Sequence, residues 1–266
     1  MTATAPCPAA CVALAARLAD AARGIVRRYF RQEPTVERKD DRSPVTVADR
    51  EAEAVLRGLI ARAFPDHGIV GEEYGAERPD AEFVWILDPI DGTTRFIAGH
   101  IQFGTLIGLL HRGVPVMGMI DMPMLDERWT GATGRPTVHA VRGTPRTVRA
   151  RACPGLERAI LFATTPHMFP GDDFAAFERV RARAGQPMYG GECYAYGLLA
   201  SGTVDLVIEA TMGPYDYLPL VPVVAGAGGI ITDWAGAPLG LDSDGRVIAA
   251  GDRRCHGAAR ALLAGG

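Results

Sequence analysis

The chain has 266 residues, of which 48% are hydrophobic and 22% charged, and its formal net charge is −3. This length can bury a large core, as one big domain or two lobes, and the charge gives no reason to expect nucleic-acid binding. No apolar run reaches the roughly 20 residues that a membrane span needs, and the N-terminus lacks the order of a signal peptide. We therefore expect a cytoplasmic protein that binds neither nucleic acid nor a membrane.

The first half of the chain predicts helices packed on a largely antiparallel sheet. Apolar residues recur at three- and four-residue spacing from Pro8 to about Phe30 and from Asp49 to Phe64, as in amphipathic helices. The polar segment between them, 33–42, predicts a loop. Strands are predicted from apolar or alternating runs at 69–73, 83–87, 103–110, 114–121 and within 128–151. The turn at 111–113 predicts a hairpin of the strands around it.

The second half predicts alternating strands and helices, which is α/β in character. The predicted strands are 159–162, 204–209, 229–233 and 248–250, and the predicted helices are 172–184, 193–201, 217–226 and a last one through Leu263. In the helix at 172–184, Phe174, Phe177 and Val180 are expected to share one side. We place the boundary between an N-terminal lobe, 1–151, and a C-terminal lobe, 152–266.

Two local groups of residues could suggest binding sites, and we interpret both more simply. Cys7 and Cys11 are four apart but lack partner histidines or cysteines nearby, so we expect all five cysteines to be reduced thiols, mostly buried. Four arginines cluster toward the end of the first half and are interpreted as the solvated face of a hairpin: Arg142, Arg146, Arg149 and Arg151.

One segment, Asp88-Pro89-Ile90-Asp91-Gly92-Thr93-Thr94, follows the buried strand 83–87 and combines carboxylates with a turn. Carboxylates ligate hard cations such as Mg²⁺, and turn N–H groups and hydroxyls hold phosphate. Glu72-Glu73 and Tyr215-Asp216 are further acids at strand ends or turns. Singly, each is explained as well by a solvated surface group or a helix cap. No periodicity brings the three segments together.

The segment 88–96 resembles the signature of the inositol monophosphatase family. Gly71-Glu72-Glu73 lies upstream at the family's interval, Val45-Thr46-Val47-Ala48-Asp49 resembles an earlier family segment, and Tyr215-Asp216 with 226–229 resembles the C-terminal signature. Within the family, the segments 190–197 and 215–223 look most similar to the histidinol-phosphate phosphatase branch. The resemblance implies the layered αβαβα sandwich of the sugar-phosphatase superfamily, an α+β fold.

The resemblance also implies roles for individual residues. Two or three Mg²⁺ ions would be held by Glu72, Asp88, the Ile90 carbonyl, Asp91 and Asp216. The catalytic residues would be Glu72, Thr93 and Asp49, with Asp49 accepting a hydrogen bond from Thr93. Phosphate would be bound by Asp91, Gly92, Thr93 and Thr94. Thr93 could instead be only a helix cap, and Asp49 only a helix-start acid. The roles of Glu73 and of Lys39, which could lie near a third metal, are left open.

Substrate choice is a separate expectation. Histidinol phosphate carries an ammonium group and an imidazole, so its pocket needs carboxylates beyond those used by metal. Glu192 and Glu209 are the candidates to bind that ammonium group, although Glu192 could be only a helix-start acid. Arg95 could reach substrate or a partner subunit, or form a surface salt bridge. Tyr194, Tyr196 and Tyr217 could stack on imidazole or be core residues.

The expected reaction is Mg²⁺-dependent hydrolysis of L-histidinol phosphate, a step of histidine biosynthesis, by metal-activated water. The alternative substrates are inositol 1-phosphate and other sugar phosphates. A rival of another class is a binding protein that kept the fold and contacts RNA or the transcription machinery through its arginines. The resemblance implies a small phosphate ester as the partner and a homodimer as the assembly.

Overall fold

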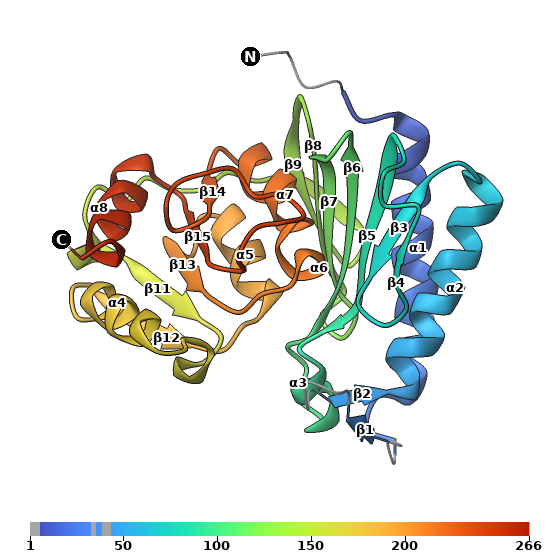
Figure 1. Ribbon diagram of the computed structural model, residues 1–266, viewed down its shortest axis with the longest axis horizontal. Coiled ribbons are helices and arrows are strands. Elements are labelled where there is room, and N and C mark those ends of the chain that lie inside the picture. Colours follow the sequence, from blue (N-terminus) through green and yellow to red (C-terminus); the bar gives the residue numbers. More distant parts are fainter. Residues whose placement is uncertain (1–5, 33–35, 39–43, 266) are drawn as a thin grey trace.

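The computed structural model describes residues 6–32, 36–38 and 44–265. Its elements form layers in the order helices, sheet, helices, sheet, helices (Figure 1), which confirms the predicted αβαβα sandwich. The outer helices on one side are α1 (Ala9–Tyr29) and α2 (Val47–Ala63). The middle layer holds α5 (Cys193–Ala200), α6 (Pro214–Tyr217) and α7 (Leu220–Gly226), and the far side holds α4 (Asp172–Arg181) and α8 (Arg253–Leu263).

The large sheet has eight strands in the order β10-β9-β8-β7-β6-β5-β3-β4. In chain order they are β3 (Gly68–Gly71), β4 (Gly75–Glu77), β5 (Phe83–Asp91), β6 (Gly104–His111), β7 (Val114–Met122), β8 (Glu127–Ala132), β9 (Arg135–Val141) and β10 (Thr144–Thr147). All pairs are antiparallel except β3 with β5. The register of β5 on β6 shifts between Asp88 and Asp91, so the acidic end of β5 departs from the regular ladder.

The small sheet has five strands in the order β12-β11-β13-β15-β14. These are β11 (Ile160–Ala163), β12 (Gln186–Tyr189), β13 (Leu206–Glu209), β14 (Ile230–Thr232) and β15 (Val247–Ala250). β11 runs parallel to β12 and β13, whereas β15 is antiparallel to β13 and β14. The remaining elements are the paired strands β1 (Val36–Arg38) and β2 (Pro44–Thr46), the short helix α3 (Thr93–Ile97), and 3₁₀ turns at Leu156–Arg158 and Pro166–Met168.

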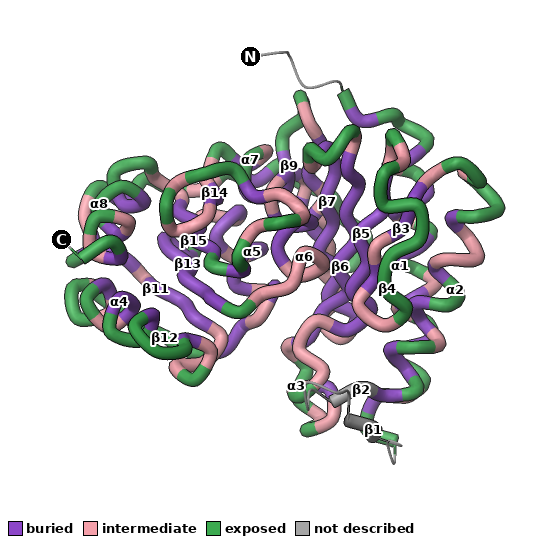
Figure 2. The backbone as a smooth tube through the Cα atoms, viewed as in Figure 1, coloured by how far each residue is buried: buried purple, intermediate pink, exposed green. Residues whose placement is uncertain are grey.

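Strand β5 is buried on both faces because helices cover both sides of the large sheet (Figure 2). Val84 and Ile86 contribute to the core that faces the middle helices, and Trp85 and Leu87 contribute to the core under α1 and α2. This alternation follows from the two-residue period of a strand. A strand with no solvated face reads as a continuous apolar run, and that is the pattern the sequence has.

Helix α7 lies so close to the large sheet that two sheet positions must be glycine. A Cβ on Gly118 would stand 1.7 Å from the Pro219 carbonyl oxygen, and one on Gly131 would stand 2.2 Å from that of Pro222. The two prolines therefore lie against strands β7 and β8 without a side chain between them. This contact joins the C-terminal half of the chain to the sheet of the N-terminal half.

Several predictions need correction. Phe174 is 44% exposed, unlike Phe177 and Val180, because α4 turns it away from the small sheet, and α4 ends at Arg181 rather than at 184. The helix expected at 217–226 starts later, as α7 at Leu220 with Pro219 as its N-cap, and a separate short helix, α6, ends at Tyr217. Strands β4 and β12 were not predicted, since each is short and fully exposed.

Other expectations hold. Strands β6 and β7 form the predicted hairpin. The four clustered arginines are all exposed, but only Arg142 and Arg146 belong to the hairpin of β9 and β10, whereas Arg149 and Arg151 follow it and Arg151 pairs with Asp205. The five cysteines are all buried and free. Within the described residues, no helix is both long and apolar enough to span a membrane. Residues 33–35 and 39–43, with Lys39, lie outside the described residues, while β1 is a strand where a loop was expected. The division at 151 and 152 remains a prediction.

Candidate active site

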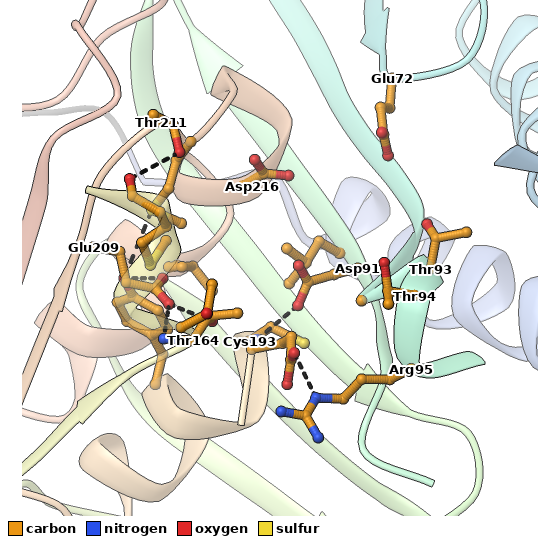
Figure 3. A pocket seen from close by; sticks show the side chains of 18 of the residues that line it. Glu72, Asp91, Thr93, Thr94, Arg95, Thr164, Cys193, Glu209, Thr211 and Asp216 are labelled. Atoms are coloured by element: carbon orange, nitrogen blue, oxygen red, sulfur yellow. Dashed lines mark hydrogen bonds and ion pairs between the residues drawn. The ribbon is translucent and has the colours of Figure 1, made fainter. Parts of the chain in front are cut away.

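A cavity of about 720 Å³ opens where the end of β5 meets the middle helices and the small sheet. Its walls come from both halves of the chain, as Figure 3 shows: Glu72 and Thr93 on one side, Glu209 and Thr164 on the other. The size suits a small organic molecule. Most of the residues singled out in the sequence line it: Glu72, Asp91, Gly92, Thr93, Thr94, Arg95, Glu192, Glu209 and Asp216.

Three aspartates from two distant segments converge beside this cavity. One carboxylate oxygen of each of Asp88, Asp91 and Asp216 lies within 4.8 Å of the others. Each carboxylate is fixed by a backbone N–H: Ile90 donates to Asp88 at 3.0 Å, Cys193 to Asp91 at 2.6 Å and Gly213 to Asp216 at 2.7 Å. The fold thus joins acids whose meeting no sequence pattern could show. Glu72 points toward the space between Asp216 and Thr93 (Figure 3).

The electrostatics of this cluster are those of a cation site. Burial and the negative charge of Glu72 raise the pKa of Asp88 well above its usual value, and burial and the charge of Asp91 do the same for Asp216. Crowded, buried carboxylates disfavour their own ionisation unless a cation shares the site. Hard divalent cations take oxygen ligands of this kind. The carboxylates and the neighbouring Ile90 carbonyl therefore fit Mg²⁺ as a group.

Thr93 and Asp49 meet at the edge of the cluster. The Thr93 hydroxyl lies 3.4 Å from Asp49 Oδ1 and 3.1 Å from the Ile90 carbonyl oxygen. Asp49 is fully buried, and its Oδ2 also accepts the N–H and hydroxyl of Thr46 at 2.8 and 2.5 Å, which makes a capping box at the start of α2. The helix-cap interpretation of Asp49 and its contact with Thr93 therefore hold together.

Gly92 forms the turn between β5 and α3. Its φ is 88°, in the left-handed region that favours glycine, and a Cβ there would meet Glu192 Cγ at 3.2 Å. The turn ends the strand directly after Asp91 and starts α3 at Thr93. Thr94 follows on the exposed side of α3 and lines the cavity.

Glu192 and Arg95 form an ion pair in the lining of the cavity. Arg95 Nε donates to Glu192 Oε1 at 2.5 Å, and the Gly191 N–H donates to Glu192 Oε2 at 2.8 Å. Glu192 precedes α5 with φ of 43°, a left-handed conformation that costs energy for a residue with a side chain. Burial raises the pKa of its carboxyl. Arg95 is thus paired within the chain and lines the cavity, which the sequence left open.

Glu209 stands at the end of β13, 3% exposed, on the far wall of the cavity. Thr164 donates to it through its N–H at 3.1 Å and its hydroxyl at 2.5 Å, and Tyr196 donates through its hydroxyl at 2.9 Å. Burial raises the pKa of Glu209 to about 7. Tyr196 lines the cavity, whereas Tyr217 is a core residue whose hydroxyl donates to the Gly240 carbonyl. Tyr194 stands edge-on to Trp129.

Some residues of the site were missed in the sequence. Thr164 and Thr211 line the cavity just after β11 and β13. Hydroxyls that follow two parallel neighbouring strands are a detectable signal, because ligands of α/β sheets bind beyond the carboxyl ends of strands. Glu53 was also missed, a buried acid in α2 that accepts the N–H groups of Glu73 and Tyr74. As part of an amphipathic helix, it gave no signal of its own.

Comparisons with known proteins agree with this geometry. The chain is 47% identical over 248 residues to the bifunctional phosphatase IMPL2, chloroplastic, of Arabidopsis thaliana, covering 90% of this chain and 70% of that protein. It is 33% identical over 237 residues to a histidinol-phosphatase of Chlorobaculum parvum, covering 89% and 90%.

Among solved structures, an inositol monophosphatase from Zymomonas mobilis superposes with a TM-score of 0.86 at 43% identity, over 95% of this chain and 97% of that one. The sequence pattern of the inositol monophosphatase family matches residues 9–264 of this chain. The chain therefore belongs to the inositol monophosphatase family, as its sequence motifs and its acidic cluster indicate.

Proposed function

We propose that this phosphatase hydrolyses L-histidinol phosphate to L-histidinol and phosphate, with Mg²⁺ as its cofactor. The observation that carries the proposal is the placement of two further acids, Glu192 and Glu209, in the same cavity as the acidic cluster. A substrate with a phosphate at one end and an ammonium group at the other would match both regions. The named histidinol-phosphatase relative supports the same substrate.

Glu72, Asp88, the Ile90 carbonyl, Asp91 and Asp216 would hold the metal. When bound, Mg²⁺ would neutralise the carboxylates and lower the pKa of the attacking water, which eases the loss of its proton. Thr93, held by Asp49 and the Ile90 carbonyl, would orient the attacking water, and Glu72 would take its proton. Asp91 and the turn of Gly92, Thr93 and Thr94 would hold the phosphate in line for that attack.

At the other end of the cavity, Glu209 and Glu192 would bind the substrate ammonium group. Glu209 already accepts three hydrogen bonds from Thr164 and Tyr196, so its carboxylate is fixed in place before the substrate enters. Arg95 would compete with the substrate for Glu192. This arrangement predicts a preference for a cationic leaving group over a neutral one.

The deciding experiment compares kcat/KM for histidinol phosphate and inositol 1-phosphate, each with Mg²⁺ and with EDTA. We expect Mg²⁺-dependent hydrolysis with histidinol phosphate preferred by at least about 10-fold, the value of one charge-assisted hydrogen bond. A preference for inositol 1-phosphate would reject histidinol phosphate as the substrate but would leave the proposed phosphatase activity standing.

The second candidate is an inositol 1-phosphate phosphatase, and one observation favours it: the Arg95 ion pair partly neutralises Glu192. No turnover of any monoester, together with polyanion binding, would instead favour a binding protein. A cytoplasmic location is proposed from the five free thiols, which suit a reducing compartment. A homodimer is proposed from the family alone.

A further inference from the structure

One face of helix α2 carries three polar residues at four-residue spacing: Asp49, Glu53 and Arg57. Residues four apart on a helix are neighbours on one face. Asp49 contacts Thr93, as described above. Glu53 and Arg57 instead contact the turn between β3 and β4, and this turn begins with Glu72. One helix therefore contacts Thr93 directly and also the backbone that follows Glu72, and these are the two groups that would handle the attacking water.

The contacts on the turn are specific. Glu53 Oε2 accepts the Glu73 N–H at 2.8 Å, and Oε1 accepts the Tyr74 N–H at 3.2 Å and Arg57 Nε at 2.7 Å. Arg57 also donates to the Gly75 carbonyl. The N–H of Glu72 itself donates to the Leu87 carbonyl at 3.1 Å, so the backbone of the turn is fixed on both sides of the Glu72 side chain.

The chain makes room for this arrangement. Glu53 is fully buried, which is rare for a glutamate unless its charge is compensated. A Cβ on Gly71 would stand 2.1 Å from Glu53 Oε1, so only glycine at 71 lets the carboxylate reach beneath the turn. A buried ion pair is weak support for stability alone, because desolvation offsets its attraction. The cost of burying the Glu53 carboxylate is explained if Glu53 fixes a neighbouring residue whose side chain must be placed accurately.

We propose that Glu53 is a positioning residue: it clamps the backbone at 73 and 74 and thereby aims the Glu72 carboxylate at the acidic cluster. The inference rests on the proposed function, because it assigns Glu72 to the metal and the water. Substituting a residue that holds a metal ligand in position typically lowers metal affinity by roughly 10- to 100-fold.

The test measures Mg²⁺ affinity by calorimetry on the full chain without substrate. Glu53→Gln should weaken Mg²⁺ binding by roughly 10- to 100-fold, and Gly71→Ala should act in the same direction, because its Cβ displaces the carboxylate. Glu51→Gln is the matched control. It removes a carboxylate of the same helix that pairs with Arg28 and Tyr29, away from the turn. Its Mg²⁺ affinity should equal that of the wild type.

Hydrogen exchange provides a second readout, and its measurement on the wild type does not depend on a variant folding. In the wild type, the backbone amides of Glu73 and Tyr74 should exchange more slowly than is usual for residues in a turn. In Glu53→Gln the same two amides should exchange faster than in the wild type. Wild-type protein that neither binds Mg²⁺ nor releases phosphate would reject the proposed function. Wild type that does both, with Glu53→Gln binding Mg²⁺ as tightly as Glu51→Gln, would overturn this inference alone. Fast exchange at 73 and 74 in the wild type would overturn it as well.

Discussion

The Asp91 carboxylate, at the end of β5, accepts a 2.6 Å hydrogen bond from the N–H of Cys193, the first residue of α5. A carboxylate of the large sheet is thereby fixed by a helix from the other half of the chain. The interaction also places negative charge at a helix N-terminus, where the dipole favours it. Asp91 can thus stay in a crowded acidic cluster that would otherwise repel it.

Asp91→Asn should greatly lower metal-dependent activity while keeping the fold. The amide oxygen can still accept from Cys193, but one charged ligand is lost, so kcat/KM should fall on the order of 10³-fold, more than for a residue behind a ligand. In EDTA the variant should melt at a higher temperature than the wild type, because one buried like charge is gone. Thermal melts with EDTA and with Mg²⁺ measure this. Full activity, or a lower melting temperature in EDTA, would contradict the assignment.

Thr93→Ala should lower kcat by about 100-fold, the lower range for a group that assists proton transfer, because the water loses its orienting hydroxyl. Thr93→Ser keeps the hydroxyl and should stay within about 5-fold of the wild type. Mg²⁺ affinity should not change in either variant. Steady-state kinetics at saturating Mg²⁺ decide the question, with Thr144→Ala as the control, because Thr144 is an exposed threonine of β10 that does not line the cavity. Equal losses for Ala and Ser would show that the hydroxyl is not the working group.

Glu192→Gln should raise KM for histidinol phosphate by roughly 10-fold, the value of one charge-assisted hydrogen bond, and leave KM for a neutral phosphate ester unchanged. Arg95→Gln is the reciprocal variant. It frees the Glu192 carboxylate from its ion pair and should lower KM for the cationic substrate. The comparison requires both substrates with each variant. If Glu192→Gln affects the two substrates equally, Glu192 serves only to hold α3 against α5.

The substrate preference should depend on pH through Glu209. Burial raises the pKa of this carboxyl from 4.5 to about 7, so it is mostly neutral below pH 7 and negative above it. The ratio of kcat/KM for histidinol phosphate to that for a neutral ester should therefore rise as the pH increases through about 7. The ratio cancels the ionisation of the phosphate, which both substrates share, whereas the imidazole titrates only in histidinol phosphate. Glu209→Gln keeps the imidazole and removes the titration of Glu209, so the rise of the ratio near pH 7 should be absent in this variant. A rise of the same size in the wild type and in Glu209→Gln would remove Glu209 from substrate binding.

The same shift predicts a stability change. Because the folded pKa of Glu209 lies above the unfolded value, its contribution to stability is complete below pH 4.5 and is lost as the pH rises toward 7. Glu209→Gln should therefore gain stability relative to the wild type between those pH values, which chemical denaturation at several pH values would measure.

The sequence predicted the large sheet well because its strands are neighbours in the chain. The hairpin of β6 and β7 needs only local alternation and a turn, and β5 needs only its apolar run. By contrast, β12 is short, exposed and paired with a strand 20 or more residues upstream, so no local pattern marks it. The prediction that Phe174 shares the buried side of α4 was wrong for a related reason. In a short helix, tertiary packing decides which side chains are buried.

The site divides in the same way. The residues around Asp88 and Asp91 could be named because they form one continuous motif, and Glu72, Asp49 and Asp216 followed by resemblance. The ion pair of Arg95 with Glu192 could not be predicted, because it depends on where α3 meets α5. Glu53 reads as an ordinary helix glutamate paired with Arg57 four residues on. Only the fold shows that Glu53 is buried, with its carboxylate in the space that Gly71 leaves by having no side chain.

The five buried thiols can report local opening of the fold without any added label site. They lie in three places: Cys7 and Cys11 in the core under α1, Cys153 and Cys255 in the core of the small sheet, and Cys193 beside Asp91. A thiol-reactive dye would therefore label each place only when that part of the molecule opens. Labelling at Cys193 alone would time the separation of α5 from the end of β5, and a divalent cation held between them would slow that labelling first.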